Sequence, residues 1–333
     1  MENEKMIVTQ DMVDSFLHTQ KLDFTVEMKP TFIQGKETIV DGVAQAGNNI
    51  NIGYCPVRTD TYAPLSRGGL SEGFTPIQNR DAFRVLTQLS GVKDIQLRNG
   101  GTWGGGAGVF AQVSLGDMTV GNGNDKVGKY LSVVNSHDGS RALNILITPY
   151  RYFCMNQIAK SINKAQDAVG KFLSVRHNAS ADEKLEELIR TVTIADEVFQ
   201  QTEETYNKLA TLKINEEYVK EVLNKLFPLN PEYADKSKKS RGRTIWENNV
   251  TAVRDRFYNS DQGRVDTMTA WNLYNAVQGT FQHDARKTDT IHRSILMGEI
   301  ADKSALALST VLEVCSSESL PQSVHAEIDA LLA

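Results

Sequence analysis

The stretch NSHDGSRALNILITPYRYFCMN, residues 135–156, decides how the first half of the chain folds. Asp138 and Gly139 lie between two runs rich in Val, Leu and Ile, residues 129–135 and 141–149. Asp-Gly is among the dipeptides that favour tight hairpin turns, because both turn positions take positive φ. The stretch therefore predicts a β-hairpin.

The second strand of this hairpin shows the two-residue period of a strand with one buried face. Leu143, Ile145 and Ile147 share that face, and Pro149 is expected to end the strand because proline has no N–H for the ladder. Arg141 and Arg151 flank the strand. They are cations that could reach a phosphate backbone, although an arginine near a turn is otherwise simply solvated.

His137 and Asp138 raise a catalytic alternative, in which the imidazole is a base oriented by the carboxylate. Neighbours in a tight turn point in different directions, and the sequence places no serine or cysteine nucleophile beside them. The hairpin is the better interpretation, and we predict no catalytic residue.

The composition predicts a large core and no overall basic character. The chain has 333 residues, 40% of them hydrophobic, a formal net charge of −5 and a pI near 5.8. Nucleic-acid binding would therefore need a local basic patch. The three cysteines form no CxxC motif, which is typical of a reducing compartment. Because no signal peptide and no bilayer-spanning segment is present in the sequence, we expect a cytoplasmic protein without membrane contact.

The order of the periodic segments predicts an α+β fold. Up to about residue 150 the chain shows short β-like runs and hairpins, with a short helix around Phe16, an alternating strand at 21–30 and a helix at 81–89. Helical periods then cover 155–173, 182–209, 216–227, 269–282 and 289–315, the last as one long helix. We predict a β-rich region, 1–150, and a helical region, 151–333, packed on it as one integrated domain.

Two segments have the composition of known sites but are better explained structurally. The glycine-rich run 98–110 lacks the Gly-Lys-Ser/Thr ending of a phosphate loop, so it predicts a turn or bulge before a strand. A DNA-contacting loop around Trp103 is the alternative. Asp23, Glu27 and Lys29 suggest a metal-dependent nuclease, yet they fall on the polar face of the alternating strand. We predict no metal and no cofactor.

The strongest charge signal lies at residues 236–264, KSKKSRGRTIWENNVTAVRDRFYNSDQGR, where eight basic residues oppose three acidic ones, a net charge of 8 − 3 = +5. Trp246, Phe257 and Tyr258 interleave with the cations, a pattern typical of single-strand binding, in which cations follow phosphates and rings stack on bases. The alternative is a solvated basic loop and a helix whose aromatic residues are core. With the hairpin arginines, the predicted nucleic-acid-binding residues are Lys236, Lys238, Lys239, Arg241, Arg243, Trp246, Arg254, Arg256, Arg141 and Arg151.

Several separate segments resemble one protein family. They are NSHDGSRAL and TPYRYFCMN in the opening stretch, VRTDTYAPL at 57–65, VRHNAS at 175–180 and MTAWNLYNAVQGTFQH at 268–283. They resemble the phage- and plasmid-borne family called domain of unknown function 932, over about residues 22–283. The resemblance implies DNA metabolism in a bacterial host cell and phage or host replication or recombination proteins as partners. It implies no reaction and no catalytic residues.

These observations together predict a phage-type single-stranded DNA-binding protein, an annealing or recombination mediator that acts without nucleotide hydrolysis, rather than an enzyme. A homo-oligomer would let many weak sites act on one strand. Two alternatives stay open. One is a metal-dependent nuclease whose carboxylates are distant in sequence, and the other is a module that binds a host protein through the helices between 182 and 221.

Overall fold

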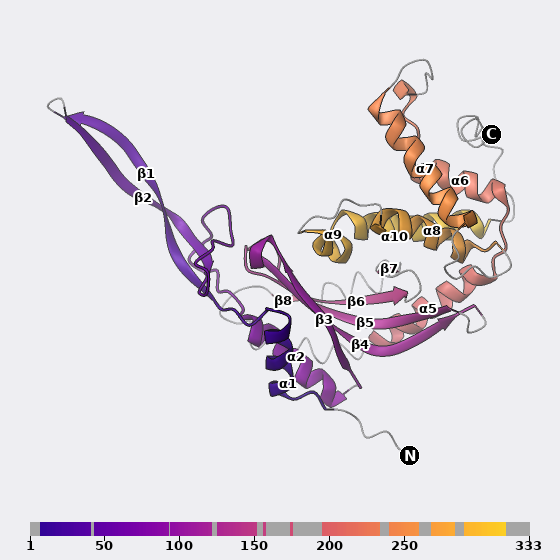
Figure 1. Ribbon diagram of the computed structural model, residues 1–333, viewed down its shortest axis with the longest axis horizontal. Helices are drawn as coiled ribbons and strands as arrows, with labels where there is room; N and C mark the ends of the chain where they lie inside the picture. The colour runs from indigo at the N-terminus through magenta and orange to yellow at the C-terminus, as the bar shows by residue number, and fades with distance from the viewer. Residues whose placement is uncertain are drawn as a thin grey trace. The chain divides into compact units, whose positions relative to one another are not determined.

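A computed structural model of the chain describes residues 7–40, 43–92, 94–121, 125–151, 156–157, 174–175, 195–233, 240–259, 268–283 and 290–317. Strands occupy the first half and helices the second, which confirms the predicted α+β class (Figure 1). The chain forms two compact units that interleave along the sequence. Unit 1 comprises Met1–Leu115, Leu131–Leu146 and Asp167–Ala195, and unit 2 comprises Gly116–Tyr130, Ile147–Gln166 and Asp196–Ala333.

The first sheet is a ribbon of two long antiparallel strands, β1 (Val26–Val40) and β2 (Val43–Arg58). The predicted alternation at 21–30 is confirmed, because Leu22, Phe24 and Val26 are buried while the residues between them are exposed. The regular strand begins only at Val26. The acidic and basic residues of this segment lie on the solvated face, as predicted, where Lys29 Nζ is 2.5 Å from Glu27 Oε2.

The second sheet contains β3 (Gln96–Trp103), β4 (Gly108–Val120), β5 (Asp125–Ser136), β6 (Leu143–Arg151) and β7 (Asn156–Gln157) in that order, and β8 (Ser174–Val175) also pairs with β6. The glycine-rich run forms the tight link between β3 and β4, as predicted. Its 3₁₀ turn, η1 (Gly104–Gly106), has positive φ at all three glycines. Trp103 is 4% exposed and stacks on Phe110, and this packing argues against the alternative of a DNA-contacting loop around Trp103.

The predicted hairpin is confirmed as β5 and β6, with Leu143, Ile145 and Ile147 buried. Two details of the predicted hairpin were wrong. The connection is wider than a two-residue turn, and of its Asp-Gly pair only the glycine, Gly139, takes a positive φ. The strand also continues through Pro149 to Arg151. A proline interrupts a ladder only where its N–H would have been a donor, so its presence alone does not end a strand.

The described helices of unit 1 are α1 (Gln10–Thr19) and α2 (Asn79–Val92), which pack against each other. Helix α1 begins after Thr9, whose side chain accepts a hydrogen bond from the Met12 N–H. Both helices were predicted from their apolar period. Their buried faces, with Leu17 and Phe83 among them, contribute to the core of unit 1.

The described helices of unit 2 are α5 (Ala195–Thr211), α6 (Glu216–Leu226), α7 (Arg241–Asn259), α8 (Ala270–His283), α9 (Ile291–Met297) and α10 (Glu299–Cys315). The predicted helices at 216–227 and 269–282 are confirmed within one residue at each end. The predicted single helix at 289–315 is wrong, because Gly298 has an extended backbone, with φ −119° and ψ −153°, that separates α9 from α10. The predicted helix at 155–173 is wrong at Asn156 and Gln157, which form β7, and its other positions lie outside the described residues. The predicted helix at 182–209 is confirmed from Ala195 onward as α5, and residues 182–194 lie outside the described part.

Helix α8 is the centre of the unit 2 core. It is buried on nearly every side and packs against α7 and α10. Trp271 and Tyr274 meet Tyr206 of α5, with ring centroids of Trp271 and Tyr206 4.8 Å apart. Trp271 Nε1 donates to Asp125 Oδ2 at 2.8 Å, which satisfies the indole in the interior.

Cys315, the last residue of α10, is expected to lower the free energy of unfolding at alkaline pH. Its thiol is buried, and burial raises its pKa to about 12. An unfolded cysteine ionises near pH 8.5, so the contribution of the neutral thiol is complete below about pH 8.5 and is lost as the pH rises toward 12. Urea unfolding at pH 10.5 should therefore show a loss of about 2 to 2.5 kcal/mol relative to pH 8 that Cys315→Ala lacks. Equal losses in both proteins would contradict this expectation.

Candidate functional site

The described part of the basic segment forms α7. Lys236, Lys238, Lys239 and Arg264 lie outside the described residues. The helix begins after Ser240, whose Oγ accepts a hydrogen bond from the Arg243 N–H at 3.1 Å. Its first turn contains Arg241 and Arg243 and no acidic residue. This charge distribution is the reverse of what the helix dipole favours, since a helix amino end is stabilised by negative charge.

Two predicted site residues on α7 have structural contacts of their own. Arg243 is 8% exposed, and its guanidinium donates to Glu247 Oε1 at 2.8 Å and to the Tyr233 carbonyl at 3.1 Å. Trp246 is 6% exposed, and its Nε1 donates to the Phe227 carbonyl at 2.8 Å. Phe257 is buried as well. A buried indole cannot stack on a base, so this packing argues against Trp246 as a binding ring and agrees with the alternative of core aromatics.

The other arginines of α7 differ in their surroundings. Arg241 is exposed at the first residue of the helix. Arg256 lies along α8, where a Cβ placed on Gly279 would be 3.2 Å from the Arg256 Cδ. Its stem therefore packs on the helix surface. Arg254 is half-buried and lies beside Tyr258, with its guanidinium carbon 5.8 Å from the ring centroid. This separation is within the range of a cation–π contact.

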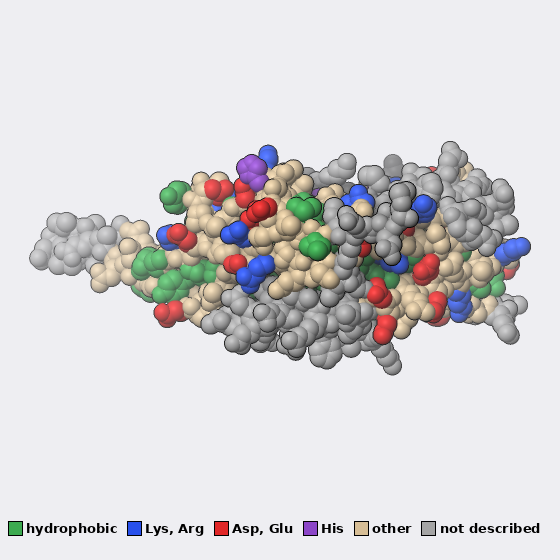
Figure 2. All heavy atoms as spheres, turned by 90° about the horizontal axis from the view of Figure 1, so that it is seen from below, with side chains coloured by type: hydrophobic (Ala, Val, Ile, Leu, Met, Phe, Trp, Pro, Cys, Tyr) green, Lys and Arg blue, Asp and Glu red, His purple; other side chains and the backbone are tan. Residues whose placement is uncertain are grey.

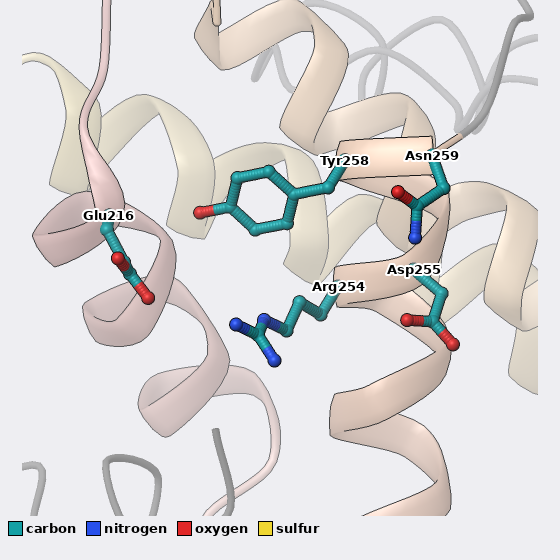
Figure 3. Close-up of a pocket in the computed structure, with 5 residues that line it drawn as sticks. All are labelled: Glu216, Arg254, Asp255, Tyr258 and Asn259. Atoms are coloured by element: carbon teal, nitrogen blue, oxygen red, sulfur yellow. The ribbon is translucent and has the colours of Figure 1, made fainter. Parts of the chain in front are cut away.

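Arg254 and Tyr258 belong to a pocket of about 370 Å³ that is open to solvent and is also lined by Glu216, Asp255 and Asn259. The side chains of Arg254 and Tyr258 extend from α7 toward Glu216, the first residue of α6 (Figure 3). Helix α6 begins there because Asn215 caps it, accepting hydrogen bonds from the N–H groups of the next turn.

The electrostatics of this pocket are mixed. Burial raises the pKa of Tyr258, and the negative charge of Glu216 raises it further, so the hydroxyl stays protonated. One guanidinium stands with two carboxylates, which leaves the pocket with a net charge of −1. The groups offer a ring face, a cation, carboxylate acceptors and an amide. They suit a planar ligand with hydrogen-bond donors better than a phosphate.

Neither His137 nor Arg141 is among the described residues that line this pocket. His137 is fully buried in unit 1, where its Nε2 hydrogen-bonds with Asn79 Oδ1 at 2.8 Å. This burial argues against the catalytic alternative, because the imidazole has no exposed face at which a substrate could bind. Arg141 is half-buried in the hairpin connection, and its Nε has no hydrogen-bond partner among the described residues. Arg151 lies in β6, and its side chain is outside the described part.

Sequence reasoning missed three of the pocket residues. Glu216 comes from another helix, and nothing local in the sequence brings it to Arg254. Asp255 and Asn259 lie on α7 but carry no motif. Arg254 and Tyr258 are four residues apart, so their contact on one helix face could have been predicted.

The part of the chain that the structure describes lacks two features, a metal-binding cluster and a membrane-spanning helix. No three His, Cys, Asp or Glu side chains lie together as a possible metal site. No helix within these residues has both the length and the apolar character needed to cross a membrane.

The fold and site define an α+β protein with a basic helix end and an arginine–tyrosine pocket. The sequence profile described as a domain of unknown function (DUF932) matches residues 68–305. The chain therefore belongs to this family, which confirms the resemblance. No curated protein and no solved structure matches the chain.

Proposed function

We propose that this protein binds single-stranded DNA through the amino end of α7 and the Arg254–Tyr258 pocket. The observation that supports the proposal most is the charge at the start of α7. Five cations, Lys236, Lys238, Lys239, Arg241 and Arg243, occupy eight positions at a helix end whose first turn holds no acid. Arg241 and Arg243, which lie in the first turn of α7, each oppose the helix dipole by about 0.3–1 kcal/mol.

A bound polyanion would offset that unfavourable arrangement. Phosphates are favoured at helix amino ends, where unpaired N–H groups and the dipole attract negative charge. Arg243 already has Glu247 and the Tyr233 carbonyl as partners, so the phosphate-binding group is expected to be Lys236, Lys238, Lys239 and Arg241. Function is often found where a sequence departs from a local preference, here the preference for negative charge at a helix amino end.

The pocket at the other end of α7 supports binding of an unpaired base. Tyr258 offers a ring for stacking, and Glu216 and Asp255 offer acceptors for exocyclic amino groups. A base inside a duplex could not present both its face and its edge in this way. The preference for single strands follows from this arrangement. Annealing of complementary strands or mediation of recombination, without nucleotide hydrolysis, is the role we propose for such binding.

The test is fluorescence anisotropy of a labelled oligonucleotide, single-stranded and duplex, at several salt concentrations. The variant K236Q/K238Q/K239Q/R241Q removes four cations and keeps Arg243, whose loss would disturb the fold. If all four contact phosphates, the slope of log affinity against log salt should fall by about 3. The matched control, R98Q/K126Q/K208Q/K213Q, removes four exposed cations from elsewhere and should keep the wild-type slope.

Two outcomes would contradict the proposal. One is no binding by the wild-type protein at low salt, which would favour a protein partner instead. The other is an equal loss in both variants, which would show only a general dependence on charge. Cleavage of the oligonucleotide with magnesium, abolished by a chelator, would favour the nuclease alternative.

A further inference from the structure

The ribbon of β1 and β2 has no core of its own. We call residues 27–55 of these strands the arm. Its strands are 15 and 16 residues long, and within the described part of the chain no side chain of the arm is buried. An isolated two-stranded hairpin is only marginally stable in water, because one layer of two strands cannot bury enough apolar surface. A ribbon of this length therefore needs something to cover it.

The arm exposes an apolar patch. Phe32, Ile33, Ile50 and Ile52 are 53%, 48%, 55% and 42% exposed. Ile33 and Ile50 are direct cross-strand partners on one face of the ribbon. Phe32, which pairs with Asn51, projects from the opposite face, because successive side chains of a strand alternate. Hydrophobic side chains gather on the described part of the arm (Figure 2). Single exposed apolar residues are ordinary, but a contiguous group marks an interaction surface.

The free edge of the arm lacks the protection that edge strands usually have. From Val43 to Val57, β2 contains no charged residue. In the described chain, β2 pairs with a segment other than β1 only at Tyr54 and Val57, through Leu70 and Pro64. Residues 43–51 are thus an uncharged edge. Natural proteins normally guard such edges with charges, because an open edge templates pairing with another chain.

The charge of the arm decides what kind of partner fits. Between Val26 and Val57, two lysines stand against two glutamates and one aspartate, a net charge of −1. A polyanion would find no attraction there. The partner must therefore be uncharged and apolar where it meets the arm, and must offer a strand edge of its own.

We propose that the arm is the element through which two copies of this chain associate. The second copy offers the same uncharged edge and the same apolar patch, so a two-fold antiparallel pairing of β2 with its counterpart is self-complementary. A 15-residue strand is about 50 Å long, which is sufficient for much of the roughly 800 Å² per partner that stable dimers bury. The inference does not depend on the proposed DNA binding.

The test is sedimentation velocity of the full chain over micromolar concentrations, after nuclease treatment and at high salt, so that bridging by nucleic acid is excluded. The wild-type protein should be dimeric or larger. I33K/I50K should be monomeric, a roughly hundredfold weakening of association. The matched control, I245K/L306K, places lysines at residues that are 50% and 56% exposed elsewhere and should stay assembled. Asn49→Lys charges the edge without removing an apolar group and should also weaken association.

Three results would overturn the proposal: a monomeric wild-type protein at about 100 μM, assembly of I33K/I50K equal to wild type, or dissociation of the control as well. Thermal unfolding shows whether the variants are folded. Since the arm has no buried side chain, their midpoints should match that of the wild-type protein. The oligonucleotide titration of monomeric I33K/I50K separates the two proposals, because its salt slope per chain depends on α7 and not on the arm.

Discussion

Replacing Trp271 with alanine is expected to lower the free energy of unfolding of unit 2 by about 4 kcal/mol. Trp271 is among the largest fully buried side chains, and its ring lies against Tyr206 and Tyr274 with centroids 4.8 and 5.9 Å away. The substitution would leave a cavity in an aromatic cluster that α8 cannot close by moving, since it is held by α7 and α10. It would also remove the indole donor to Asp125 Oδ2.

Trp271→Phe separates these two effects. It keeps most of the ring contacts but loses the hydrogen bond to a buried carboxylate, which should reduce stability by about 1 to 3 kcal/mol. Urea unfolding followed by far-ultraviolet circular dichroism gives the free energies, and hydrogen exchange of peptides from α8 assigns the loss to unit 2. Leu306→Ala, at a residue 56% exposed, is the control and should change stability by less than about 0.5 kcal/mol. If Trp271→Ala matched this control, the assignment of α8 as the core of unit 2 would fail.

Most elements of this fold could be predicted from local periodicity. The helices at 216–226 and 270–283 show an apolar stripe with period 3.6, and the hairpin strands alternate with period two. The same reasoning identifies Trp246, Val250, Val253 and Phe257 as one buried stripe of α7. Their spacing of four, three and four residues is a stronger signal than their proximity to arginines. That spacing predicts that Trp246 lies in the core, as the structure shows.

The errors come from features that periodicity does not encode. The apolar pattern continues across Gly298, so the sequence predicts one helix, whereas the backbone is extended at that glycine. Pro149 lies within β6 although proline usually marks a strand end. In each case the outcome depends on tertiary packing, which overrides the local preference of one residue.

The candidate site was predictable only in part. Charge composition alone identifies the basic segment around α7. The contact of Arg254 with Tyr258 follows from their spacing, but Glu216 reaches the pocket through the packing of α6, which no local pattern shows. Which arginines of α7 are held by other side chains and which are exposed also depends on tertiary packing. Arg243 is held by Glu247 and the Tyr233 carbonyl, whereas Arg241 is exposed two residues away.

Replacing Asn79 with alanine is expected to destabilise unit 1 by about 3 kcal/mol. Asn79, at the start of α2, is 1% exposed and joins three segments that are distant in sequence. Its Oδ1 hydrogen-bonds with His137 Nε2 at 2.8 Å, and its Nδ2 donates to the Leu22 carbonyl at 2.9 Å. Alanine would leave both buried groups without this partner, and each such loss reduces stability by about 1 to 3 kcal/mol.

The surroundings of His137 explain why it belongs to this network. Its backbone N–H donates to the Ala107 carbonyl at 2.7 Å, and its ring meets Phe24 edge to face. The Arg58 guanidinium in turn lies over the Phe24 ring, 3.9 Å from its centroid. His137, on which the catalytic alternative rested, therefore holds the hairpin connection against α2 and against the segment before β1.

Unfolding of Asn79→Ala, His137→Ala and the double variant tests this interpretation. Because the two side chains share a hydrogen bond, the double variant should lose less stability than the sum of the single losses, by about 1 kcal/mol or more. Asn99→Ala, at an exposed position of β3, serves as the control and should have little effect. Additive losses would show that the contact contributes no coupling. Salt-dependent oligonucleotide binding by His137→Ala, measured where it is folded, should equal that of the wild-type protein, because a structural histidine in unit 1 makes no contact with the strand. A loss of binding in this folded variant would restore a functional role for His137.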